Sequence, residues 1–331
     1  MSFIQSFKES IFKINKRDFE KKAIELFNFQ FSENPVYNQF VKSIHRDPPK
    51  IKAIQEIPFL PIEFFKYHDI KSGNWLPQHV FESSGTTGSQ KSRHFIHDLP
   101  FYTENAANLF EKEYFPLKGL NILALLPSYL ERDNSSLVYM VNDFVKRSGS
   151  PYSGFYLETN EKLIEMLTVL KNKNSPTLLI GVTFALLDFA ESNPMDLSGI
   201  IIMETGGMKG RRKELTRQEV HSRLKKAFNV SAIHSEYGMT ELLSQAYAKE
   251  DGFFKPGPTM QVFIRDINDP FDLGKKQKRG GINVIDLANF STCAFIETQD
   301  QGIIDENENF QVLGRLDNTE QRGCSLLLEQ Q

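Results

Sequence analysis

A loop rich in glycine and hydroxyl side chains, closed by a lysine, is the part of this sequence best suited to chemistry. It reads Ser83-Ser84-Gly85-Thr86-Thr87-Gly88-Ser89-Gln90-Lys91. Glycines let the backbone approach a ligand closely and adopt positive φ angles. Consecutive N–H groups form a nest for an anion, and the lysine adds a point charge. The composition therefore indicates a loop that wraps phosphate oxygens.

The Walker A loop of many nucleotide-binding proteins is the obvious alternative. Its pattern, G-x-x-x-x-G-K-[ST], applied from Gly85, requires glycine at position 90, where this chain has Gln90 followed by Lys91 and Ser92. The glycines at positions 85 and 88 are three residues apart instead, so the loop must curl differently. The segment thus predicts phosphate binding by another class of loop.

The elements that must position this loop follow from the apolar patterning of the chain. Short apolar runs alternate with helical patterns, which favours βαβ units and a largely parallel sheet. Strands are predicted at 121–126, 177–182, 200–203 and 230–234, and helices at 101–113, 135–147, 160–173, 183–191 and 212–227. Helices are also predicted within 1–45, and short strands at 260–266, 281–287, 293–298 and 303–313. We therefore expect an α/β fold, with mostly parallel sheets flanked by helices and a β-rich C-terminal part.

Two of the predicted strands run directly into further polar segments. The strand 200–203 continues into Glu204-Thr205-Gly206-Gly207-Met208-Lys209-Gly210, and the strand 230–234 continues into Ser235-Glu236-Tyr237-Gly238-Met239-Thr240-Glu241. Open α/β sheets bind ligands at the carboxyl ends of their strands. The pair Gly206-Gly207 would let a flat base lie against the backbone, although a plain turn before the next helix fits these residues equally well.

The loop at 83–91 resembles the phosphate loop of the acyl-adenylate-forming enzymes, [ST]-S-G-[ST]-T-G-x-P-K, at eight of nine positions, with Gln90 in place of proline. Residues 237–241 resemble the Y-G-x-T-E segment of the same family. This resemblance implies that adenine stacks on Tyr237, that Thr240 contacts the α-phosphate and that Glu241 binds Mg²⁺, an ion that takes carboxylate ligands. It also implies a set of further residues that bind the nucleotide: Ser83, Ser84, Gly85, Thr86, Thr87, Gly88, Lys91, Gly206, Gly207 and Gly238. A less favoured alternative for Glu241 is an acid in the first turn of a helix.

Two segments near the C-terminus add to this resemblance. Thr298-Gln299-Asp300-Gln301-Gly302 and Gly314-Arg315-Leu316-Asp317 are similar to the family's T-G-D and G-R-x-x-D segments. Gln299 replaces the glycine of the first segment, and Asp317 follows one residue early in the second. The resemblance implies that Asp300 and Arg315 bind the ribose hydroxyls.

Residues 126–132, 204–210 and 314–325 narrow the resemblance to the acyl-protein synthetase, or LuxE-type, branch of the superfamily. In that branch a cysteine near the carboxyl end accepts the acyl group, and Cys324 holds such a position. A thiolate is a strong nucleophile, and Arg322 would lower the pKa of a nearby thiol. Cys324 fits equally a small buried residue that begins the apolar run at 326–328.

The resemblance divides the chain into a helical segment at 1–45, an adenylate-forming core at 46–317 and a tail at 318–331 that carries Cys324. The family's usual small C-terminal domain, whose lysine helps to form the adenylate, is not expected here, because 14 residues follow Asp317. Another group would then have to do the work of that lysine.

Composition points to an ordinary globular protein and excludes several classes. The 331 residues are 40% hydrophobic and 24% charged, which is enough for a substantial core. The net charge of −3 gives no reason to expect nucleic acid binding. Two cysteines are too few for a disulfide framework. We see no signal peptide and no apolar run long enough to span a membrane, so we expect a cytoplasmic protein.

The resemblance implies an ATP- and Mg²⁺-dependent ligase that converts a carboxylic acid, most simply a fatty acid, into acyl-AMP. The acyl group then passes to a thiol, which forms a carbon–sulfur bond. The implied partners are the small-molecule acid and an acyl-acceptor protein or acyl carrier. Two alternatives stay open: an acyl-coenzyme A ligase, and a non-catalytic nucleotide- or acyl-binding subunit of an acyl-transfer complex.

Overall fold

Helices and strands alternate along most of the chain. The structure is a computed structural model that describes residues 2–83, 90–126, 134–156, 160–206, 215–273 and 279–316. The α-helices in these ranges are α1 (Phe3–Ile11), α2 (Lys16–Glu33), α3 (Pro35–Ser43), α4 (Phe64–Tyr67), α5 (Leu99–Glu113), α6 (Ser136–Ser148), α7 (Asn160–Asn172), α8 (Thr183–Ser192) and α9 (Arg217–Phe228). The 3-10 helices are η1 (Pro48–Lys50), η2 (Ile54–Glu56) and η3 (Leu287–Asn289). The strands are β1 (Leu60–Pro61), β2 (His79–Glu82), β3 (Arg93–Ile96), β4 (Asn121–Leu125), β5 (Gly154–Phe155), β6 (Thr177–Val182), β7 (Ile201–Thr205), β8 (His234–Tyr237), β9 (Ala246–Ala248), β10 (Phe253–Pro256), β11 (Met260–Arg265), β12 (Gly280–Asp286), β13 (Phe295–Ile304) and β14 (Phe310–Arg315).

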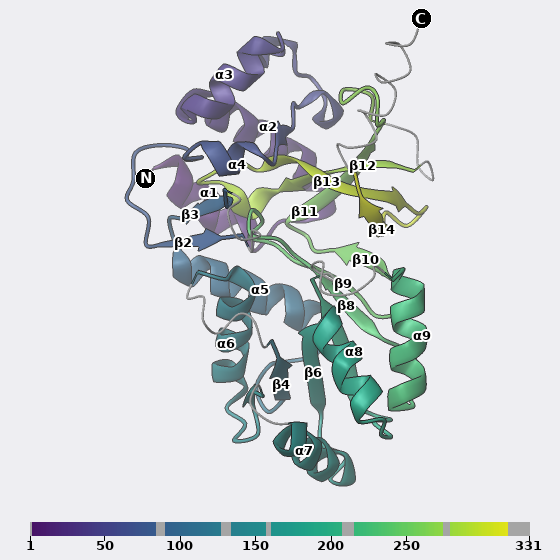
Figure 1. The fold of residues 1–331 in the computed structure, drawn as a ribbon. Helices are drawn as coiled ribbons and strands as arrows, with labels where there is room; N and C mark the ends of the chain where they lie inside the picture. The colour runs from purple at the N-terminus through teal and green to yellow at the C-terminus, as the bar shows by residue number, and fades with distance from the viewer. Residues whose placement is uncertain are drawn as a thin grey trace, which may run out of the picture.

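A long mixed sheet runs through the molecule (Figure 1). Within the described residues its twelve strands follow the order β11-β12-β13-β14-β10-β9-β8-β7-β6-β4-β5, with β1 beside β13. The strands from β5 to β8 are parallel, and those from β8 through β9, β10 and β14 to β11 are antiparallel. The strands β2 and β3 form a separate antiparallel hairpin. The parallel and antiparallel halves therefore meet at β8.

The parallel half is covered by helices on both faces. In Figure 1, α5 and α6 lie on one side of β4 and β6, and α8 and α9 lie on the other. Every residue of β4 and of β6 is buried, as expected for parallel strands with both faces covered. Gly181 in β6 fits this close packing, because a Cβ atom there would lie 2.9 Å from Cγ of Leu186 in α8.

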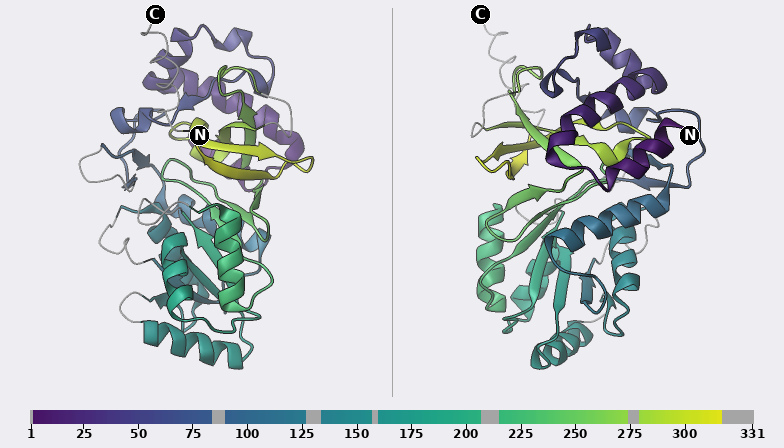
Figure 2. Two further views of the ribbon diagram at one scale, coloured as in Figure 1. Left: turned by 45° about the vertical axis from the view of Figure 1, so that its right-hand side comes forward. Right: turned by 180° about the vertical axis from the view of Figure 1, so that it is seen from behind.

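The antiparallel half packs against the N-terminal helices, drawn in purple beside and above the green and yellow strands in both views of Figure 2. The Tyr37 ring of α3 stacks on Phe295 of β13 with centroids 5.9 Å apart. Gln30 of α2 donates to the carbonyl of Asn289 across 2.8 Å and accepts from the N–H of Ala294 across 2.9 Å. The helices predicted at 1–45 thus contact the C-terminal part of the chain through hydrogen bonds and ring stacking. The domain boundaries at residues 45 and 317 stay a prediction.

The predicted fold class is confirmed: an α/β fold, with parallel strands flanked by helices and a β-rich C-terminal part. Two predicted strands are wrong in their bounds. The stretch 303–313 contains the end of β13, a turn and the start of β14, and β8 covers His234–Tyr237 where 230–234 was predicted. The apolar residues Val230 and Ile233 suggested the earlier position, whereas the strand itself buries the polar Ser235 and Glu236. Among the helices described, none combines the length and apolar character needed to cross a bilayer.

Candidate active site

Tyr237, the last residue of β8, is held in one position by its neighbours. The centroid of its ring lies 5.0 Å from that of Phe310, edge to face, and 5.6 Å from that of Phe254. Its hydroxyl donates a hydrogen bond to Oδ2 of Asp300 across 2.9 Å. Burial, and then the charge of Asp300, raises the pKa of Tyr237 well above its usual value. The tyrosine therefore stays neutral and acts as a donor.

Asp300 and Arg315 face each other on the paired strands β13 and β14. Nε of Arg315 lies 3.7 Å from Oδ1 of Asp300, and the side chains are 79% and 14% exposed. Burial raises the pKa of Asp300, an effect that Arg315 and the hydrogen bond from Tyr237 partly offset. The structure thus brings together three predicted site residues from three segments. An acidic side chain beside a bound nucleotide is a usual partner for ribose hydroxyls.

The segment that follows β8, which begins at Gly238, is anchored by the buried carboxylate of Asp286. This carboxylate accepts hydrogen bonds from the N–H groups of Leu243 and Ser244 across 2.8 and 2.9 Å, and from the Ser244 hydroxyl across 2.6 Å. It also accepts from the N–H of Ala288 across 3.0 Å. Burial raises the pKa of Asp286, and these hydrogen bonds lower it. The segment is therefore fixed to the end of β12.

The backbone of Thr240 and Glu241 is held by two further side chains. Asn289 donates to the carbonyl of Glu241 across 2.8 Å. Nδ1 of His94 lies 2.7 Å from the carbonyl of Thr240, and its Nε2 lies 3.1 Å from the Thr292 hydroxyl. Burial lowers the pKa of His94 to about 4, so the ring is neutral. Nδ1 then donates to the carbonyl and Nε2 accepts from the hydroxyl.

The carboxyl group of Glu241 lies next to the stem of the predicted phosphate loop. Its side chain is buried. Burial raises its pKa, while a hydrogen bond to the Ser92 side chain and the charges of Arg315 and Lys66 lower it. The N–H of Ser92 donates to the Ser83 hydroxyl across 2.9 Å, and the N–H of Ser83 donates to the carbonyl of Ser92 across 3.0 Å. The two ends of the loop therefore meet beside Glu241.

Lys91 lies at the end of this loop and is paired with the hairpin that carries it. Its Nζ lies 3.0 Å from Oε2 of Glu82, with 43% of the lysine side chain exposed. The neighbouring Gln90, which departs from the family pattern, donates to the carbonyl of Lys66 across 2.6 Å. The loop's other predicted ligands, Ser84, Gly85, Thr86, Thr87 and Gly88, lie outside the described residues.

The glycine pair predicted to face the base follows β7. Gly206 has a φ of +68°, in the left-handed region that favours glycine. The Thr183 hydroxyl donates to its carbonyl across 3.3 Å. Gly207 lies outside the described residues. The chain therefore turns at Gly206, at the carboxyl end of a parallel strand.

Glu204 at the end of β7 is a buried acid to which the sequence patterns gave no role. It accepts from the Thr183 hydroxyl across 2.8 Å, and its Oε1 lies 3.3 Å from Nε of Arg217 and 3.6 Å from Nε2 of His221. Burial alone would raise the pKa of Glu204, but Arg217, His221 and the neighbouring hydroxyls hold it below its usual value. Glu204 is therefore ionised, and it ties β7 to α9.

Glu236, the other acid with no role assigned from sequence, lies one strand away. The Thr205 hydroxyl is hydrogen-bonded to its carboxyl group, and a Cβ atom at Gly238 would overlap with its Oε1. Burial raises the pKa of Glu236 to about 7, and the charge of Glu204 adds to that rise. Glu236 follows the polar residues His234 and Ser235, so no strand pattern in the sequence signalled this group.

The cysteines and the possible metal ligands are the remaining candidates for chemistry in this chain. Cys293 is buried just before β13, and burial raises the pKa of its thiol to about 12. Cys324, the predicted acyl acceptor, lies outside the described residues. The described part of the chain contains no group of three or more histidine, cysteine, aspartate or glutamate side chains able to hold a metal. A single carboxylate such as Glu241 suits Mg²⁺ that is bound mainly by substrate phosphates.

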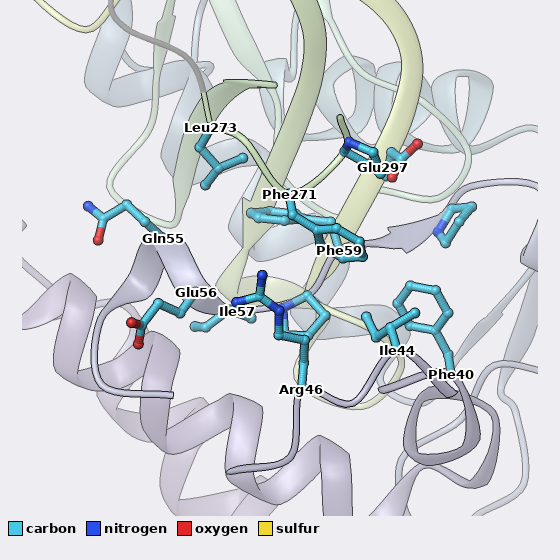
Figure 3. A pocket seen from close by; sticks show the side chains of 13 residues that line it. Phe40, Ile44, Arg46, Gln55, Glu56, Ile57, Phe59, Phe271, Leu273 and Glu297 are labelled. Carbon is cyan, nitrogen blue, oxygen red and sulfur yellow. The ribbon is translucent and has the colours of Figure 1, made fainter. Parts of the chain in front are cut away.

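A cavity of about 260 Å³ lies elsewhere, between the end of α3, η2 and β13. Figure 3 shows Phe40 and Ile44 on one side of it and Phe59 and Phe271 on the other, with the Arg46 side chain reaching between them. None of the predicted site residues lines it. It is therefore separate from the cluster around Tyr237 and Glu241.

Residues 135–331 match the family model of acyl-protein synthetase, LuxE. A curated relative, luciferin 4-monooxygenase of Luciola mingrelica, is 23% identical over 289 residues, which cover 80% of this chain and 50% of the relative. The chain thus spans half the length of that relative.

Solved structures share the fold. A 2-hydroxyisobutyryl-CoA ligase in complex with 2-HIB-AMP and CoA is 13% identical and has a TM-score of 0.64, covering 90% of this chain and 69% of its own. ATP-bound MatB of Rhodopseudomonas palustris is 18% identical and has a TM-score of 0.52, covering 71% of this chain and 47% of its own. At such low identity these likenesses establish the architecture and nothing more.

Proposed function

This chain belongs to the LuxE family of acyl-protein synthetases, and on that premise we propose that it joins a carboxylic acid to AMP, with release of pyrophosphate, and passes the acyl group to a thiol. The observation that carries the proposal is the meeting of Tyr237, Asp300 and Arg315 beside Glu241. These residues come from separate segments and supply an aromatic ring, a sugar-binding carboxylate, a cation and a second carboxylate.

In this proposal the nucleoside binds at the junction of the two halves of the sheet. The adenine lies between the Tyr237 ring and the backbone at Gly206-Gly207, and Asp300 and Arg315 bind the ribose hydroxyls. The support is the geometry: packing and a hydrogen bond hold the Tyr237 ring, and Arg315 lies opposite Asp300 in the register of β13 and β14. Such pre-positioned groups need little reorganisation when the ligand arrives.

The phosphates then bind toward the loop at 83–91. Ser83 is closed against Ser92, and the carboxyl of Glu241 lies beside this stem, which supports a phosphate site there. Lys91 would exchange its contact with Glu82 for the phosphates, as Glu82 and Lys91 are both partly exposed. Bound Mg²⁺ would neutralise phosphate charge, with Glu241 as its protein ligand and Thr240 at the α-phosphate.

The chemistry is two successive substitutions. An oxygen of the substrate carboxylate attacks the α-phosphorus, the bond to the β-phosphate oxygen breaks, and pyrophosphate leaves. A thiolate then attacks the acyl carbon, the bond to the AMP oxygen breaks, and AMP leaves while the thiol proton passes to solvent. This chain's residues mainly position the reactants and stabilise negative charge. We propose a fatty acid, plain or substituted, as the acid.

The acceptor thiol distinguishes two versions of the function. In the first version Cys324 takes the acyl group, alone or on its way to an acyl carrier protein. In the second version the acceptor is coenzyme A, and the likeness of the fold to a CoA ligase favours testing it. Intact-mass measurement after incubation with acid and ATP separates them. Acyl mass on the wild type but not on Cys324→Ser means self-acylation, whereas acyl mass found solely on added coenzyme A assigns the ligase.

The test of the adenylation step is carboxylate-dependent exchange between ATP and labelled pyrophosphate over a panel of acids. We expect exchange with at least one acid and none without acid. Nucleotide binding without exchange across the whole panel would overturn the proposal in favour of a non-catalytic nucleotide-binding subunit.

A further inference from the structure

Three polar side chains lie close together at the β8–β9 pair. Glu236 stands directly opposite Tyr247 in the antiparallel register, so their Cβ atoms are neighbours. Gln245 lies two residues before Tyr247, just ahead of β9. Its Cγ atom lies 3.6 Å from the position that a Cβ atom would take at Gly238, where the Glu236 carboxyl also lies. We call Glu236, Gln245 and Tyr247 the polar cluster.

Two members of the polar cluster are buried without hydrogen-bond partners. Tyr247 and Gln245 are 3% and 4% exposed, and neither the Tyr247 hydroxyl nor Oε1 of Gln245 has a partner among the described residues. A buried polar group left unpaired costs about 1–3 kcal/mol, and such groups in native proteins call for an explanation. A bound ligand with hydrogen-bonding groups of its own would supply the partners.

The polar cluster lies on the opposite side of β8 from the candidate nucleotide site. Successive residues of a strand point to opposite faces, and Tyr237 points toward Asp300 and Phe310. Glu236 therefore points away from the nucleotide, and its charge acts on Tyr102 of α5 as well as on Tyr247. Gly238 follows directly after β8, and the Glu236 carboxyl lies against it. The polar cluster and the candidate nucleotide site are therefore both next to Gly238. If the substrate carboxylate reacts near Thr240, the carbon atoms next to that carboxylate would contact the polar cluster.

The Glu236 carboxyl group can donate as well as accept a hydrogen bond. It is buried, with the Thr205 hydroxyl as its partner, and the ionised Glu204 on the neighbouring strand β7 opposes a second negative charge. Tyr102 and Tyr247, which face it from α5 and β9, have raised pKa values through burial and stay neutral. Among the residues that the structure describes, the surroundings thus offer neutral hydrogen-bonding groups to Glu236 and no cation acts on its pKa.

We propose that Glu236, Gln245 and Tyr247 recognise a neutral hydrogen-bonding substituent, a hydroxyl group, on the carbon chain close to the carboxylate that is activated. The inference rests on the proposed adenylation and deepens it, because it names the substrate class: a hydroxy acid in place of a plain alkyl acid. Glu236 is then the residue that determines specificity.

The test compares matched acids of equal chain length, one unsubstituted, one with a 3-hydroxyl and one with a 3-amino group. Wild-type protein should favour the hydroxy acid over the alkyl acid by at least ~10²-fold in kcat/KM for pyrophosphate exchange, since a site built to bond a hydroxyl rejects the analogue that lacks it. Glu236→Leu should abolish this preference, and Glu236→Gln, which keeps donor and acceptor atoms, should retain most of it. Glu104→Gln, an exposed acid of α5 paired with Arg147, is the matched control.

Binding of the same acids by calorimetry gives a readout that needs no turnover. Tighter binding of the hydroxy acid that is lost in Glu236→Leu supports the inference even if exchange fails for every acid, in which case adenylation is what fails. A wild-type preference for the alkyl acid, or an equal loss for all acids in Glu236→Leu, overturns the inference. A wild-type preference for the 3-amino acid that is lost in Glu236→Gln also overturns the inference. That result would mean that an ionised Glu236 pairs with the ammonium group of the substrate. Circular dichroism melting of each variant confirms that it is folded.

Discussion

The hydroxyl of Tyr237 donates a hydrogen bond to Oδ2 of Asp300 across 2.9 Å and so ties the end of the parallel strands to the antiparallel half of the sheet. The two residues are separated by 63 positions in the sequence. The ring is packed against Phe254 and Phe310 from two neighbouring strands. The candidate nucleotide site is therefore built at a structural junction, where a shift of either half would move its ligands.

Replacement of Asp300 by alanine should weaken nucleotide binding more than it weakens the fold. Loss of hydrogen bonds from a charged group to the ribose costs about 1.5–3 kcal/mol, which corresponds to a rise in the KM for ATP of roughly 10- to 150-fold. Titration of ATP in the exchange assay measures this. Asp47→Ala, whose carboxylate lies 3.8 Å from Lys50, serves as the control. An unchanged KM for ATP in Asp300→Ala would remove Asp300 from the site.

Replacement of Gly238 by alanine should clash with Glu236. The added methyl group would overlap with Oε1 of the Glu236 carboxyl, which is buried and bonded to Thr205. We expect a loss of about 1–3 kcal/mol in the free energy of unfolding, as in other overpacked sites, measured by urea denaturation. In the double variant with Glu236→Ala the two effects should not add, with a coupling of at least ~0.5 kcal/mol. Simple additivity would contradict the contact.

The free energy of unfolding should fall with rising pH because of Glu236. Its pKa is about 7 in the folded protein and 4.5 ordinarily, so between these values the folded state binds more protons than the unfolded state. The stability from this group is present below pH 4.5 and is lost as the pH rises through 7. The loss is about 3 kcal/mol at most. Denaturation from pH 5 to pH 8 should show a shallower decline in Glu236→Gln, and parallel curves would contradict the raised pKa.

Replacement of Asp286 by alanine should release the segment that carries Thr240 and Glu241. The carboxylate accepts hydrogen bonds from Leu243, Ser244 and Ala288, all buried. Leaving these donors unpaired should cost about 2 kcal/mol or more in the free energy of unfolding. It should also raise hydrogen exchange at the amides of residues 243 and 244. Exchange protection equal to wild type would show that another group holds the segment.

The sequence predicted the secondary structure and fold class of this protein better than the contacts between distant side chains. The helices and buried parallel strands follow from apolar periodicity, and the bounds of β4 and β6 agree with the prediction to one residue. The strand β8 was placed too early, because Ser235 and Glu236 are polar and a polar run reads as a turn. Periodicity cannot show that tertiary burial overrides that signal.

In the candidate site, too, some features could be predicted from the sequence and others could not. Tyr237, Asp300 and Arg315 were expected near one another from motif resemblance, and the structure places them in contact. The anchoring role of Asp286 and the cluster around Glu236 depend on pairings between distant segments, which a local pattern does not carry. The roles of all the predicted site residues stay predictions, and Ser84, Gly85, Thr86, Thr87, Gly88, Gly207 and Cys324 lie outside the described ranges.

The central claim is acyl-adenylate formation, and it is tested most directly by acid-dependent ATP–pyrophosphate exchange in the wild type and in Glu241→Ala. Removing a carboxylate that supports bound phosphates and Mg²⁺ should lower the exchange rate by about 10²-fold or more, as with other charge-stabilising groups. The control Glu104→Gln should exchange at the wild-type rate. We predict exchange in the wild type and its collapse in a Glu241→Ala variant that circular dichroism shows to be folded. Undiminished exchange in folded Glu241→Ala would contradict the account.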